Sequence, residues 1–139
     1  MNLPKHVKIV EVGPRDGLQN EKQAIDTATK VELIARLGAS GLKAIEATAF
    51  VSPKWVPQMG DNSALLEALA QTRHADVCYS VLVPNMRGFE NAILNRPDEI
   101  VIFSSASETF SQKNINSSID DIIERFEPVA EAATAPGIN

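Results

Sequence analysis

The chain has 139 residues, 44% of them hydrophobic and 22% charged, with 7 Gly, 8 Pro and a net charge of -5. This composition is typical of a soluble globular domain with a buried core, and the acidic balance argues against a nucleic-acid partner. No apolar run reaches the ~18 residues of a membrane helix, and the N-terminus shows no secretory signal. With Cys78 as the single cysteine, an intrachain disulfide is excluded and a cytoplasmic setting is expected.

Short β-rich segments alternate with helical periods from the start of the chain. Strands are predicted at residues 7–12 and 44–50. Between them, a helix is expected to begin after Asp26 as N-cap and to end near Gly38 or Gly41.

The middle of the chain continues this alternation. Asp61 or Ser63 can cap the next helix, and Asn85 the one after it. Residues 77–83 are almost continuously apolar, as in a strand buried on both faces, and residues 99–103 form the fourth predicted strand.

The last predicted helix follows a polar loop. Ser118, with Asp121 three residues later, is a helix-start pattern before an apolar stripe. Pro128 lies inside that stripe and is expected to bend the helix or remove one of its hydrogen bonds.

Four β-loop-α units in succession predict an α/β fold with a parallel sheet and right-handed crossovers. Two architectures fit the pattern about equally: half of a TIM barrel and an open flavodoxin-like sheet. A Rossmann-type sheet is not indicated, because residues 13–17 read GPRDG and lack the G-x-G-x-x-G fingerprint.

Polar residues gather where the predicted strands end, which is where active sites form in parallel α/β folds. Arg15 and Asp16 follow the first strand, and Glu46 lies in the otherwise apolar second strand. A solvated turn with a local ion pair is the ordinary explanation for an isolated Arg-Asp dipeptide. Glu46 favours a functional site over this explanation, because a carboxylate in that strand must pair with a cation or suffer a large burial cost.

Three segments carry a family resemblance that spans the chain. Residues 12–21 (VGPRDGLQNE) and 50–61 (FVSPKWVPQMGD) resemble the first two strand loops of hydroxymethylglutaryl-CoA lyases, and residues 112–116 (QKNIN) resemble a later segment. The resemblance implies the first four βα units of a TIM (β/α)8 barrel, with residues 1–139 as an incomplete N-terminal half.

The resemblance also implies a reaction, the cleavage of 3-hydroxy-3-methylglutaryl-CoA to acetyl-CoA and acetoacetate. Asp16 would be a ligand of Mg²⁺ or Mn²⁺, and Arg15 would stabilise the thioester enolate. Gln19 and Glu46 would orient the substrate, a metal-bound water or Arg15.

An acyl-CoA substrate would need further contacts on the same rim. Asn85, Lys54 and Lys113 are candidate substrate-binding residues, and Arg87 shares their position after a strand. For each cationic side chain, an ordinary solvated surface residue is the alternative.

The chain departs from the family pattern in length and in ligands. A TIM barrel takes about 250 residues. The family's H-x-H pair, asparagine ligand and cysteine loop belong to a half not seen here, while His6 and His74 precede strands and Cys78 is expected to be an inert core thiol. We therefore expect a truncated, inactive half of a lyase. The alternatives are a lyase for another 3-hydroxyacyl-CoA and a non-catalytic half-barrel. Its open sheet edges predict a homodimer or other self-association.

Overall fold

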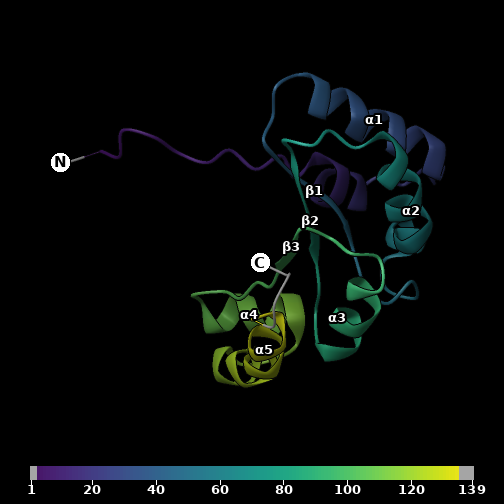
Figure 1. The fold of residues 1–139 in the computed structure, drawn as a ribbon. Coiled ribbons are helices and arrows are strands. Elements are labelled where there is room, and N and C mark those ends of the chain that lie inside the picture. Colours follow the sequence, from purple (N-terminus) through teal and green to yellow (C-terminus); the bar gives the residue numbers. More distant parts are fainter. Residues whose placement is uncertain (1–2, 135–139) are drawn as a thin grey trace.

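A three-stranded parallel sheet organises the computed structural model, which describes residues 3–134. The strands β1 (Ala44–Ala49), β2 (Cys78–Leu82) and β3 (Glu99–Val101) lie side by side in chain order. The pairing of β1 with β2 shifts register between Glu46 and Thr48. The sheet is open and does not close on itself (Figure 1).

Helices connect the strands and cover the sheet (Figure 1). The α-helices are α1 (Thr27–Ala39), α2 (Asn62–Thr72), α3 (Met86–Ile93), α4 (Glu108–Ile115) and α5 (Ile119–Ala133). Two short helical turns, η1 (Gly13–Gly17) and η2 (Pro57–Met59), lie in the loops that precede α1 and α2. Among residues 3–134, no helix is long and apolar enough to cross a membrane.

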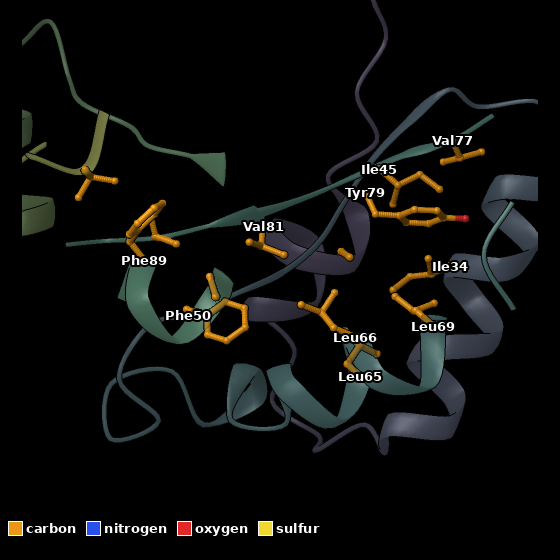
Figure 2. Close-up of a cluster of buried hydrophobic side chains, with 14 of the residues drawn as sticks. Ile34, Ile45, Phe50, Leu65, Leu66, Leu69, Val77, Tyr79, Val81 and Phe89 are labelled. Carbon is orange, nitrogen blue, oxygen red and sulfur yellow. The ribbon is translucent and has the colours of Figure 1, made fainter. Parts of the chain in front are cut away.

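The main core lies between the sheet and its helices (Figure 2). Alternate strand residues face the helices, and Ile45, Tyr79 and Val81 belong to this core. The side chains that meet them from the helices include Ile34, Leu65, Leu66 and Leu69. Burial of this alternating face fixes which side chains point the other way, and Glu46 is one of them.

Three of the predicted helix N-caps are confirmed: Asp26, Asn85 and Ser118. Asp26 accepts a hydrogen bond from the Thr29 amide at 2.9 Å, and Asn85 accepts one from the Gly88 amide at 3.0 Å. Ser118 forms a full capping box with the residue three positions later. These bonds satisfy amides that would otherwise have no partner in the first turn.

The prediction of a first strand at residues 7–12 is wrong. Only Glu11 pairs with β1, through an isolated bridge, and the segment before it runs away from the fold (Figure 1). Val7 and Ile9 are 72% and 66% exposed. With a hydrogen-bonding neighbour on one side only, the segment is fixed to the sheet only where its last residues meet β1.

Two smaller differences and one agreement concern the second half of the chain. β3 ends at Val101, two residues earlier than predicted. The polar loop contains α4, which lacks an apolar stripe and buries only Ser111, so periodicity did not reveal it. α5 continues through Pro128 to Ala133, because the packing of its apolar face outweighs one missing hydrogen bond.

Candidate functional site

The turn that carries Arg15 and Asp16 is wound around a single carbonyl. The Val12 carbonyl accepts the Arg15 amide at 3.1 Å and the Asp16 amide at 2.7 Å. Pro14 is buried inside this turn, which is π-helical. The backbone therefore presents two charged side chains from one tight, hydrogen-bonded turn.

Glu11 joins this turn to the sheet. Its carboxylate accepts the Gly13 amide at 2.7 Å, and a Cβ added at Gly13 would lie 2.7 Å from the same oxygen. The Glu11 backbone donates to the Ala44 carbonyl at 3.0 Å and accepts the Glu46 amide at 2.8 Å. The start of the turn is thus fixed in register beside Glu46.

An ion pair joins Arg15 to Glu46. Arg15 Nε donates to Glu46 Oε1, and Arg15 Nη1 donates to Asp16 Oδ1 at 2.9 Å. The Glu46 side chain is 5% exposed and that of Arg15 17%, whereas that of Asp16 is 57% exposed. A buried carboxylate therefore holds a guanidinium beside an accessible carboxylate.

The fit to a divalent metal is partial. Asp16 offers exposed carboxylate oxygens, the hard ligands that Mg²⁺ and Mn²⁺ prefer. Within residues 3–134, no group of three His, Cys, Asp or Glu side chains is placed to hold an ion. Asp16 would therefore be a single ligand, and the other described residues do not complete a metal site around it.

Among residues 3–134, no side-chain hydrogen bond or ion pair joins the other predicted site residues to Arg15, Asp16 or Glu46. Gln19 is exposed just after η1, and Lys54 and Lys113 are exposed in the β1–α2 loop and on α4. The Asn85 side-chain oxygen caps α3. Among the described residues, hydrogen bonds bring together Arg15, Asp16 and Glu46. The roles of Gln19, Lys54, Asn85 and Lys113 stay predictions.

A cavity of about 540 Å³ adjoins the turn, between the segment after η1 and the β1–α2 loop. Its walls include Gln19, Lys30, Trp55, Gln58 and Asp61. Sequence reasoning missed Lys30, although a signal was present. Lys30 lies four residues before the buried Ile34 on the core face of α1, where a charge needs a buried partner.

Cys78 lies at the opposite, amino end of the sheet. Partial burial and a 3.3 Å hydrogen bond to Glu99 raise the pKa of this thiol to about 11. A 3.0 Å ion pair with Lys8 lowers the pKa of Glu99. The thiol is therefore protonated at neutral pH and is not a nucleophile, as expected for an inert structural cysteine.

Replacement of Arg15 by Met should destabilise the fold by about 3 kcal/mol, because it leaves the Glu46 carboxylate buried without a cation. Urea unfolding monitored by circular dichroism measures the difference. Arg36→Met is the matched control, since the Arg36–Glu32 pair is exposed and should contribute at most about 0.5 kcal/mol. Equal losses in the two variants would contradict a buried ion pair at Arg15.

Known proteins resemble this chain in both sequence and structure. The chain is 54% identical to the zebrafish protein "3-hydroxy-3-methylglutaryl-CoA lyase, cytoplasmic" (Danio rerio), with 98% of this chain and 40% of the relative covered. The crystal structure of hydroxymethylglutaryl-CoA lyase from Pseudomonas aeruginosa superposes with a TM-score of 0.92 at 51% identity, covering 100% of this chain and 46% of that one.

A lyase from Acinetobacter baumannii in complex with coenzyme A and 3-methylmalate matches at 33% identity with a TM-score of 0.85, over 93% of this chain and 42% of that one. The chain thus spans less than half the length of the relatives it matches. The fold is accordingly part of a TIM barrel whose sheet is not closed. The HMGL-like family model matches residues 6–139, and the chain belongs to this family.

Proposed function

We propose that the chain carries the arginine-and-aspartate part of the active site of a carbon–carbon lyase that cleaves 3-hydroxy-3-methylglutaryl-CoA. The observation that carries the proposal is the buried Glu46 carboxylate holding Arg15 beside the exposed Asp16. The names of the zebrafish, human and Pseudomonas aeruginosa relatives, each a hydroxymethylglutaryl-CoA lyase, support the reaction class.

The reaction breaks a carbon–carbon bond. A base takes the proton of the substrate's 3-hydroxyl, and the bond between C2 and C3 breaks as C3 becomes the ketone carbon of acetoacetate. The electron pair of that bond moves onto C2, next to the thioester carbonyl, and is shared with the thioester oxygen as an enolate. Return of a proton to C2 then gives acetyl-CoA. Arg15 stabilises the enolate oxygen with a fixed positive charge, and Glu46 orients the guanidinium. Because the ion pair already exists in the free protein, this charge needs no reorganisation during the reaction.

Asp16 would hold Mg²⁺ or Mn²⁺ through a carboxylate oxygen. When bound, such an ion supplies Lewis-acid polarisation of the substrate oxygens. Gln19, three residues further along the chain, would orient the substrate or a water molecule beside Asp16. These roles rest on the resemblance of residues 12–21 to the first strand loop of hydroxymethylglutaryl-CoA lyases.

The acyl-CoA would extend along the carboxyl-end rim, where Lys54, Asn85 and Lys113 are the proposed contacts. The coenzyme A complex of the Acinetobacter relative supports this ligand class. A lyase for a different 3-hydroxyacyl-CoA is the second candidate. It is favoured by a 54% identical Pseudomonas aeruginosa relative that is named for both isohexenylglutaryl-CoA and hydroxymethylglutaryl-CoA.

We further propose that residues 1–139 alone are inactive, because Asp16 is one ligand of an incomplete metal site. We also propose a cytoplasmic location, which follows from the single cysteine. Relatives named as cytoplasmic and as mitochondrial both match the chain, so their names support neither compartment alone.

A chimera tests the proposed reaction directly. This chain would replace the matching segment of the Pseudomonas aeruginosa enzyme, and acetoacetate formation from 3-hydroxy-3-methylglutaryl-CoA with Mg²⁺ would be measured. The chimera should be active, and Arg15→Met should lower its kcat by about 10²–10³, the usual loss for a group that stabilises a developing oxyanion.

Arg36→Met in the same chimera is the control and should leave kcat unchanged. The 139-residue chain by itself should give no turnover. A folded chimera that is inactive, or one whose rate does not depend on Arg15, would contradict the proposed function.

The alternative that the chain forms a non-catalytic, self-associating half-barrel has a specific observation in its favour. An apolar groove of about 430 Å³ lies between the end of β3 and α5, next to the exposed Ile102, Phe103 and Ile123. At the other edge, the exposed Val7 and Ile9 leave a second apolar surface. We propose that two copies cover these surfaces, because apolar patches of this kind are rarely left in water.

Sedimentation velocity at micromolar concentration tests this association. A dimer or larger species is expected for the wild-type chain. Ile123→Lys, which places a charge at the groove, should shift the distribution toward monomer. The exposed Leu94 provides the control, since Leu94→Lys lies away from the groove and should leave the dimer intact. A clean monomer for the wild-type chain would contradict self-association.

A further inference from the structure

An ion pair between Lys30 and Asp61 lines the cavity that adjoins the Arg15 turn. Lys30 on α1 is 3% exposed, and its ammonium lies 2.8 Å from Asp61 Oδ1 and also donates to the Gln58 carbonyl. The second oxygen of Asp61 accepts the Thr27 hydroxyl at 2.8 Å. The pair thus ties the first turn of α1 to the end of the β1–α2 loop.

The Gln58 side chain extends this connection to the segment that follows the Arg15 turn. Gln58 Oε1 accepts the Ile25 amide at 3.0 Å, and Gln58 Nε2 donates to the Gln23 carbonyl at 2.9 Å. The ammonium of Lys30 binds the backbone of the same Gln58. One buried cation therefore fixes the residue whose side chain joins the two loops.

The contacts with Lys30 and Thr27 replace the capping bond that Asp61 could make to α2. Asp61 stands at the N-cap position of α2, where an aspartate ordinarily accepts a helix amide, yet it makes no capping bond. Its two carboxylate oxygens bind Lys30 and Thr27 instead. The sequence prediction of a cap at Asp61 was therefore correct in position and wrong in bonding.

The two loops joined in this way are the two walls of the 540 Å³ cavity. Gln19 and Asn20 line it next to the Arg15 turn, and Trp55, 87% exposed, stands on the β1–α2 loop. We propose that Lys30 and Asp61 are positioning residues, which hold the β1–α2 loop against the segment after η1 so that both walls meet an acyl-CoA together. The identity of this ligand rests on the proposed function, whereas the positioning role does not.

Amide hydrogen exchange followed by NMR tests the positioning role without any ligand. The Ile25 amide is the reporter, because its acceptor is the Gln58 side chain. In Lys30→Met, exchange at Ile25 should become at least tenfold faster. In Arg36→Met, which breaks an exposed ion pair on the same helix, it should not change.

A second variant separates positioning from plain stability. Replacing both charges by apolar residues, Lys30→Met with Asp61→Leu, removes the unpaired charge and should return Tm most of the way to the wild-type value. The Ile25 exchange rate should stay high, because the bond that fixes Gln58 is still missing. If exchange returns together with Tm, or if Lys30→Met alone leaves exchange unchanged, the pair is structural only and the proposal fails.

Coenzyme A titration, followed by the fluorescence of Trp55, the only tryptophan, adds a ligand readout. The double variant should bind coenzyme A at least fivefold more weakly than the wild-type chain, and equal affinity would overturn the link between the pair and the cavity. Absence of binding to the wild-type chain would count against an acyl-CoA ligand, and the exchange comparison then decides the positioning role by itself.

Discussion

A carboxylate inside a parallel sheet is a constraint that the surrounding structure must satisfy. Glu46 lies on a strand whose every residue is buried, so its charge requires a partner, and Arg15 is that partner. The turn around the Val12 carbonyl, the Glu11 contact with Gly13 and the bridge from Glu11 to β1 all place Arg15 where this pairing is possible. The exposed Asp16 follows as the next residue of the same turn.

A second buried charge has the same effect at the wall of the cavity. Lys30 is buried on the core face of α1 and finds Asp61 and Gln58 at the end of the β1–α2 loop. In both places a charge inside the fold forces a loop to a defined position. The two ion pairs together hold the segments that a carboxyl-end active site of this fold would use.

Local signals allowed much of this arrangement to be predicted from the sequence. The caps at Asp26, Asn85 and Ser118 have short-range signatures, and Glu46 in an apolar strand called for a cation. Features that depend on contacts distant in sequence were missed or misjudged. Residues 7–12 have the composition of a strand but have a neighbour only at Glu11, and α4 buries too little to produce a periodic stripe. The bonding of Asp61 depends on Lys30, 31 residues earlier, which capping rules do not consider.

Glu46 holds the Arg15 guanidinium in the free protein. The most direct measurement is the Arg15 Nε–Hε signal in a ¹H–¹⁵N NMR spectrum. The wild-type chain should show a slowly exchanging, downfield-shifted signal that persists in Asp16→Asn and is lost in Glu46→Gln. A signal at the position of a free arginine, or one that Glu46→Gln leaves unchanged, would contradict the account.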